Sequence, residues 1–135
     1  MIKTIKVTVK KQGLTAFTEK VKQVVEEVDI SDGLCTLFIQ HTSASLLIQE
    51  NYDPSAKHDL EAWLNRLVPE RDPLYTHTIE GDDDMPAHIK AALTATSVSI
   101  PVINGALALG TWQGIFLWEH RHMATTRNVI VHLSP

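Results

Sequence analysis

Apolar and polar residues alternate over residues 2–9, with branched apolar side chains on one side and lysine and threonine on the other. This two-residue period is typical of a β-strand with one buried face. A second short strand is predicted at Leu14–Phe17. Valines at helical spacing then predict a helix, which the turn residues 29–33 end. These valines are Val21, Val24, Val25 and Val28.

The middle of the chain combines apolar runs with a helical pattern. Leu34–His41 is apolar at most positions, which predicts a strand buried on both faces, and Ser45–Asn51 predicts its neighbour. Asp53-Pro54 predicts a helix start, because a capping side chain precedes proline at the first helical position. That helix is expected to bury a stripe of apolar side chains: Leu60, Trp63, Leu64 and Leu67.

Asp84 and Pro86 predict the start of a third helix, with Ile89 and Leu93 on its inner side. Glycines at 105 and 110 bound a loop or short strand, and strands are predicted at 97–103, 113–119 and 128–133. The predicted order is β-β-α-β-β-α-α-β-β-β. Strands in runs, rather than in strict alternation with helices, are typical of an α+β fold whose sheets are partly covered by helices.

Length and composition limit the organisation of the protein and its partners. The 135 residues, 44% of them hydrophobic, predict a single domain over residues 1–135. A formal net charge of -4 without a basic stripe argues against a nucleic-acid partner. No apolar run is long enough to cross a bilayer, and the N-terminus lacks a signal-type apolar segment. With Cys35 as the only cysteine, we expect a cytoplasmic protein with no membrane partner.

Polar side chains that could carry chemistry concentrate in three segments, at residues 41–53, 77–88 and 110–122. Each segment mixes histidine, carboxylate and small polar side chains next to apolar strands. Such a mixture can bind a metal ion and a phosphorylated ligand.

The histidines of these segments are candidate metal ligands. His41 and His120 end predicted strands, His88 falls in the first turn of a helix, and His77 lies in the preceding loop. Strand ends and helix starts hold a side chain in a fixed position, and neutral imidazole is a common zinc ligand. The alternative is that each ring only satisfies a hydrogen bond at the edge of the core, because the spacing matches no HExxH-type motif. The other histidines are expected at the surface: His58, His122 and His132.

Two further segments allow more than one interpretation. Asp82–Asp84 fits a solvated loop or helix cap, but also carboxylates that orient metal-binding imidazoles or support Mg²⁺. Gly110–Gly114 is no Walker loop, since no Gly-Lys-Ser/Thr follows, and its Trp112 either stacks on a ligand ring or belongs to the core.

A Ser–His nucleophile within 41–45 is disfavoured, because neighbouring strand residues point to opposite sides and no orienting acid is evident.

The chain resembles the YjbQ-like family over nearly its full length. Three motifs carry the resemblance: His41–Pro54, Glu80–His88, and Gly110–Gly114 with Glu119–Arg121. The spacings between these motifs match the family as well. The resemblance implies an α+β fold, a two-sheet β-sandwich of about seven strands with flanking helices, assembled as a homotrimer.

The resemblance also implies a function. Family members are described as secondary thiamine-phosphate synthase-like proteins, which implies a transferase that joins a pyrimidine diphosphate to a thiazole phosphate. A small phosphorylated metabolite is then the expected partner. A divalent metal ion is the expected cofactor, with zinc favoured and magnesium as the alternative.

The implied site uses residues from all three motifs. The expected metal ligands are His77, His88 and His120, with His41 as a competitor. The expected catalytic residues are Glu80, Glu119 and Arg121. The expected ligand-binding residues are His41, Ser43, Asn51, Trp112, Gln113 and Arg121.

Two other functions remain open at the level of sequence. One is a metal-dependent hydrolase or transferase acting on another phosphorylated metabolite, in which three histidines leave zinc an open position. The other is a non-catalytic trimeric metabolite-binding module, whose polar residues cap strands and form the subunit interface. The expected fold is not the TIM barrel of dedicated thiamine-phosphate synthases. Because this difference weakens the synthase interpretation, both alternatives stay open.

Overall fold

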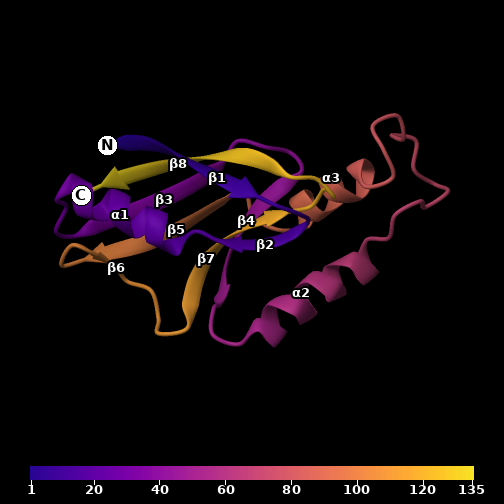
Figure 1. Ribbon diagram of the computed structural model, residues 1–135. Helices are drawn as coiled ribbons and strands as arrows, with labels where there is room; N and C mark the ends of the chain where they lie inside the picture. The colour runs from indigo at the N-terminus through magenta and orange to yellow at the C-terminus, as the bar shows by residue number, and fades with distance from the viewer.

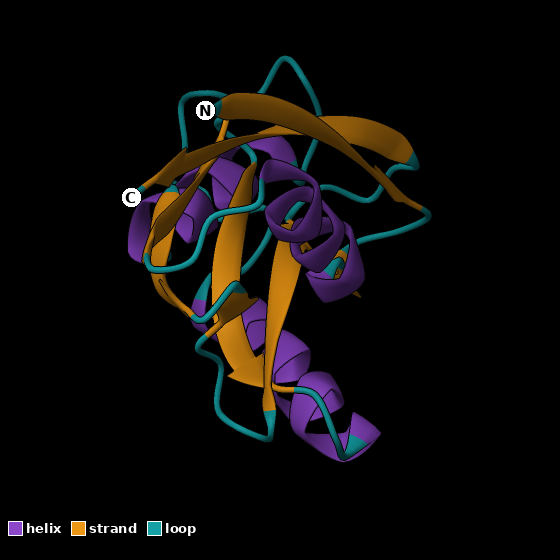
Figure 2. Ribbon diagram, turned by 90° about the vertical axis from the view of Figure 1, so that its left-hand side faces the viewer, coloured by secondary structure: helices purple, strands orange, loops and turns teal.

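Strands in two antiparallel sheets, flanked by helices, make up the protein in the computed structural model, which describes residues 1–135 (Figures 1 and 2). The strands are β1 (Ile2–Val9), β2 (Gly13–Ala16), β3 (Gly33–Ile39), β4 (Ala44–Glu50), β5 (Ser97–Ile103), β6 (Ala106–Leu107), β7 (Gln113–Glu119) and β8 (Thr125–Ser134). The helices are α1 (Thr18–Val28), α2 (Pro54–Leu67) and α3 (Asp84–Leu93). The larger sheet has the order β1-β8-β3-β5-β6, and the smaller has the order β2-β7-β4.

The predicted α+β class and the order of elements are confirmed, with one refinement. The two-residue strand β6 lies where the sequence predicted a loop or short strand, and it pairs with the end of β5. The predicted helix start at Asp53-Pro54 is also confirmed, since the Asp53 side chain accepts a hydrogen bond from the Ser55 N–H at 2.9 Å. None of the three helices combines the length and the apolar character that a membrane span requires.

The main core lies between the two sheets. Leu37 of the larger sheet and Leu46 and Leu117 of the smaller sheet are completely buried there. Helix α1 contributes Val21 and Val25 to the same core, in agreement with its predicted valine stripe. Full burial of such side chains contributes roughly 1.5–3 kcal/mol each, so this layer provides most of the driving force for folding.

A smaller core lies on the other face of the three-stranded sheet, where Phe116 and Trp118 pack with Leu64 of α2. The predicted buried stripe of α2 is wrong in part. Trp63 and Leu67 are each 52% exposed, because only one edge of this helix faces the sheet. Figure 1 shows α2 extending past the strands, away from both chain termini.

The predicted inner side of helix α3 is wrong in part, because Ile89 packs against the smaller core as predicted but Leu93 does not. Leu93 is 59% exposed, and the helix instead buries Ala87 and Ala91. These small side chains let the helix approach β4 closely. Just after the helix, the Ala95 carbonyl accepts a hydrogen bond from the Leu46 N–H of β4 at 2.8 Å. Helix α3 is thereby fixed against β4.

The outer face of the five-stranded sheet has no helix over it (Figure 2). The prediction that strand β3 is buried on both faces is therefore wrong. Leu34 and Phe38 are 43% and 47% exposed on this outer face, whereas Leu37 and Ile39 point into the core. The apolar run in the sequence reflects an outer face that carries apolar side chains, not a second core.

The start of β4, the end of β7 and the region near α3 meet at one end of the sandwich. Gly13 and Ala44 both pair with Glu119, the last residue of β7. The His120 N–H donates to the Ser43 carbonyl at 3.1 Å, which extends the pairing of β4 and β7 by one further contact. This junction positions the groups of the candidate site.

Candidate metal centre

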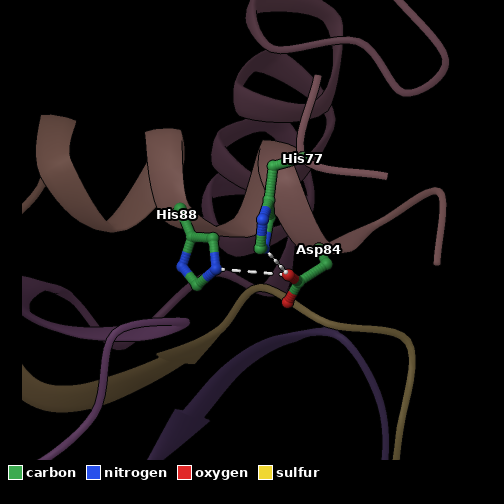
Figure 3. Close-up of side chains that lie close together, drawn as sticks. All are labelled: His77, Asp84 and His88. Carbon is green, nitrogen blue, oxygen red and sulfur yellow. Dashed lines mark hydrogen bonds and ion pairs between the residues drawn. The ribbon is translucent and has the colours of Figure 1, made fainter. Parts of the chain in front are cut away.

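His77, Asp84 and His88 bring their polar side-chain atoms together at the N-terminal end of α3 (Figure 3). Asp84 and His88 share one face of this helix because they are four residues apart, and His77 comes from the preceding loop. Oδ2 of Asp84 lies 2.7 Å from Nε2 of His77 and 3.2 Å from Nε2 of His88. One ligand atom from each residue lies within 4.8 Å of the others. The three groups could therefore share one cation.

The ring of His88 is held in one tautomer. Its Nδ1 lies 3.1 Å from the Thr42 carbonyl oxygen and 3.5 Å from Oγ of Ser43. A carbonyl oxygen can only accept, so Nδ1 carries the hydrogen. In the neutral ring Nε2 is then an unprotonated acceptor, and it faces the carboxylate of Asp84. Two acceptors in contact require a proton or a cation between them, and a histidine fixed by a backbone carbonyl is common at metal sites.

Asp84 is a buried carboxylate surrounded by cationic and hydrogen-bonding groups. It is 2% exposed, and its Oδ1 lies 3.4 Å from Nη1 of Arg121. Burial alone would raise its pKa, but contacts with His77 and Glu80 and the charges of His88 and Arg121 lower the pKa below its ordinary value. Asp84 is therefore ionised at neutral pH and available to a cation.

Asp83 anchors the loop after β7 to the start of α3. Its Oδ1 accepts from Nη2 of Arg121 at 3.2 Å, and its Oδ2 accepts from the His122 N–H at 2.7 Å. Burial raises the pKa of Asp83, but these two hydrogen bonds and the charge of Arg121 lower it overall. Asp82, by contrast, forms an exposed ion pair with Arg71 at 2.8 Å. The two interpretations of the acidic run thus apply to different residues, and only Asp84 faces the histidines.

His120 does not join this cluster. It is 1% exposed, its Nε2 lies 2.9 Å from Oγ of Ser45, and its Nδ1 has no hydrogen-bond partner. Burial, with a smaller contribution from the charge of Lys90, lowers the pKa of His120 to about 3. The ring is therefore neutral, and it lies in the interior instead of beside His77 and His88.

Glu119, one of the predicted catalytic residues, is occupied by an internal ion pair. Its Oε1 and Oε2 accept from Nε and Nη2 of Arg127 at 2.6 and 2.9 Å, and Oε2 also accepts from the Arg121 N–H at 3.1 Å. Nη1 of Arg127 lies 2.6 Å from Nε2 of His41, whose Nδ1 accepts from the Ser43 N–H at 3.0 Å. Burial first, and then the charge of Arg127, lower the pKa of His41. Both Glu119 and His41 thus have their polar atoms engaged within the protein.

The other two predicted catalytic residues border the cluster. Oε2 of Glu80 lies 3.8 Å from Nε2 of His77, and this carboxylate side chain is 60% exposed. Arg121 is held by the Glu80 carbonyl oxygen, which accepts from its Nη2 at 2.7 Å. Glu80 thus lies partly exposed beside the cluster, whereas Arg121 is fixed beside Asp84.

The remaining predicted ligand-binding residues form a second group. The Asn51 N–H donates to the Trp112 carbonyl at 2.7 Å, and the Trp112 ring packs on Tyr52 with centroids 4.5 Å apart. Trp112 is 56% exposed, so its interpretation as a core residue is wrong. Oε1 of Gln113 accepts from the Gly110 N–H at 2.8 Å. A side chain at Gly114 would place its Cβ 2.7 Å from Cβ of Asn51, so this site requires glycine.

This second group lies far from the histidine cluster. Strands β4 and β7 pair over their full length, with Ala44 opposite Glu119 at one end and Glu50 opposite Gln113 at the other. Six residue steps in an antiparallel strand span about 20 Å. One compact ligand site cannot contain both groups within a single chain.

Asp84 was not singled out as a metal ligand by the sequence, although a signal for it was present. A helix predicted to start at Asp84 places His88 four residues later on the same face, at contact distance. The surface interpretation of the other histidines agrees with the structure, since the side chains of His58 and His122 are 80% and 57% exposed.

The fold and the cluster together define a class: a two-sheet α+β protein with two histidines and an aspartate gathered at the start of a helix. The sequence model of the family described as UPF0047 protein YjbQ-like matches residues 3–135. The chain therefore belongs to the YjbQ-like UPF0047 family.

Relatives and solved structures agree with this assignment. The chain is 54% identical to a UPF0047 protein of Synechocystis sp. over 91% of this chain and 84% of the relative. It is 42% identical to the UPF0047 protein YjbQ of Escherichia coli O157:H7 over 98% of this chain and 96% of that protein. The crystal structure of a YjbQ/UPF0047 family protein from Clostridium acetobutylicum matches with a TM-score of 0.85 and 36% identity, covering 99% of each chain.

Proposed function

We propose that the protein is a metal-dependent hydrolase or transferase whose divalent cation, zinc, is held by His77, Asp84 and His88. The observation that carries this proposal is the orientation of His88, whose Nε2 faces Oδ2 of Asp84 at 3.2 Å while its Nδ1 is directed to the Thr42 carbonyl. Two imidazole nitrogens and one carboxylate oxygen match the donors of catalytic zinc sites, which keep an open position. Magnesium fits less well, because it prefers oxygen ligands.

The neighbouring residues have distinct roles in this proposal. Zinc bound there would supply Lewis-acid chemistry. Arg121 balances the charge of the buried Asp84 and fixes its orientation. Glu80, exposed and 3.8 Å from His77, is placed to take a proton from an incoming water or hydroxyl group. We propose a small phosphorylated metabolite as substrate, because a cation beside an arginine stabilises phosphate oxygens.

Metal binding provides the direct test. Replacing His88 by alanine is expected to weaken zinc binding by at least about 100-fold, since even partners outside the ligand set commonly contribute 10–100-fold. Zinc affinity is measured by competition with a chromophoric chelator and zinc content by mass spectrometry. His58→Ala is the matched control, because this side chain is 80% exposed, pairs with Asp59 and lies outside the histidine cluster. A wild-type protein that takes up no stoichiometric zinc, or equal affinity in His88→Ala, would contradict the proposal.

The reaction implied by the family resemblance is the first transfer to assay. Zinc-loaded protein is expected to join the pyrimidine diphosphate to the thiazole phosphate and release pyrophosphate, and His88→Ala is expected to slow this at least about 100-fold. Pyrophosphate release and product formation are measured together. No coupling by the zinc-loaded wild type, or an unchanged rate in His88→Ala, would reject this reaction. The metal proposal then stands or falls on the zinc measurement alone.

We also propose that the protein is a homotrimer. Exposed apolar side chains on the uncovered sheet face and on α2 support assembly: Leu34, Phe38, Trp63 and Leu67. Light scattering during size-exclusion chromatography is expected to give three times the chain mass of 15.1 kDa. Phe38→Lys tests whether the sheet face takes part, and a lower mass is expected. A wild-type mass of a single chain would contradict the trimer.

A further inference from the structure

A hollow lined by three lysines lies between the β1–β2 turn and helix α2. Its volume is about 290 Å³, and it shares no residue with the histidine cluster. Lys10 and Lys11 come from the turn and Lys57 comes from α2, with threonine side chains also in the lining. This is space for a group the size of one or two phosphates together with part of a small molecule.

The charge in this hollow is strongly unbalanced. Glu61 is the only carboxylate in the lining, and its Oε1 already accepts from the Leu14 N–H at 3.0 Å. None of the three lysines forms an ion pair, unlike Lys3, whose Nζ lies 2.7 Å from Glu27. In a chain with a formal net charge of -4, three ammonium groups against one engaged carboxylate form a local positive field. An anion bound there would relieve their mutual repulsion.

The backbone around the hollow is held in place before any ligand arrives. Gly13, with φ of 126°, turns the chain from β1 into β2. Nε2 of Gln12 donates to the His120 carbonyl at 3.0 Å, and Oε1 of Gln12 accepts from Nδ2 of Asn65 at 3.1 Å. Lys57 and Glu61 are four residues apart on α2, so they share one face of this helix, and both line the hollow. The turn and the helix are thus fixed relative to each other.

We propose that this hollow binds the phosphate group of a small-molecule ligand, at a site separate from the histidine cluster. Lysine binds phosphate as a mobile point charge, and three lysines from two elements line this hollow. A polynucleotide fits poorly, because it requires an extended basic surface and the rest of this chain is acidic overall. The site does not depend on the proposed metal centre.

The test is calorimetric titration of inorganic phosphate and pyrophosphate into the full-length, chelator-treated protein at constant ionic strength. Saturable binding is expected for at least one of these probes. Lys11→Gln and Lys57→Gln are each expected to weaken it about tenfold, as for loss of one charged hydrogen bond. Lys6→Gln removes the same charge from an exposed position outside the hollow and is expected to leave binding unchanged. His88→Ala is also expected to bind normally.

Three results would overturn the proposal. The first is the absence of saturable binding of either anion to the wild type. The second is an equal effect of Lys6→Gln and the two hollow variants, which would show a general charge effect. The third is loss of binding in His88→Ala with retention in both lysine variants, which would assign the anion to the histidine cluster.

Discussion

Replacing Glu119 by glutamine is expected to lower the free energy of unfolding by about 3–5 kcal/mol, the usual result of removing one partner from a buried ion pair. The Glu119 and Arg127 side chains are 0% and 8% exposed, and two hydrogen bonds of 2.6 and 2.9 Å join them. Glutamine keeps the shape but not the charge, so the guanidinium of Arg127 would stay buried without its counterion. Urea unfolding followed by circular dichroism measures the change.

The control for this prediction removes both charges together. Glu119→Leu combined with Arg127→Met is expected to be much less destabilising than Glu119→Gln, because buried ion pairs replaced by apolar side chains are often close to neutral. If the double variant loses as much stability as the single variant, the ion pair is not the source of the effect, and packing at the end of β7 is.

Acid is expected to destabilise the protein through His120 well above the range in which carboxylates titrate. Its pKa is about 3 in the folded protein and near 6.5 when unfolded. Between these values the unfolded chain binds a proton that the folded protein excludes, so stability is full above pH 6.5 and falls as the pH falls toward 3. The complete difference corresponds to roughly 5 kcal/mol.

The measurement compares urea unfolding of the wild type and His120→Gln between pH 7 and pH 4.5. Removing this titrating ring is expected to make the slope of unfolding free energy against pH shallower by about 1.4 kcal/mol per pH unit. His41, whose pKa is also lowered, accounts for part of the remaining slope. Asp83 and Asp84 contribute little in this window. Because their pKa values in the folded protein are lowered from the ordinary value of 3.8, the stability that they provide is lost mainly below pH 3.8. Identical slopes in the two proteins would contradict the prediction.

The order of helices and strands could be predicted, because local sequence patterns determine it. Which faces of these helices and strands are exposed could not be predicted. The alternation over β1 and the valine spacing of α1 require no knowledge of partners. The exposure of Leu34 and Phe38 depends on the five-stranded sheet having nothing over one face, and that is a property of the assembled fold. The conformational propensities of the residues and the spacing of apolar residues give no information about which face of a sheet a helix covers.

The candidate site was predictable only where its residues lie close together in the sequence. His77 and His88 are in one segment of the chain, and the structure brings them together. The predicted catalytic role of Glu119 rests on the family motif Glu119–Arg121, but the partner of Glu119 in the structure, Arg127, comes from the following strand. The grouping of Trp112 with the histidines ignored strand register, which carries it about 20 Å along the sheet.

Ser43 connects three histidines that come from three separate stretches of chain. Its N–H donates to Nδ1 of His41, its carbonyl accepts from the His120 N–H, and its hydroxyl lies 3.5 Å from Nδ1 of His88. Any shift of this one residue is transmitted to the rings of His41 and His88 and to the backbone that carries the ring of His120. Substitutions at these histidines should therefore be non-additive, and the effect of one will depend on which of the others is still present.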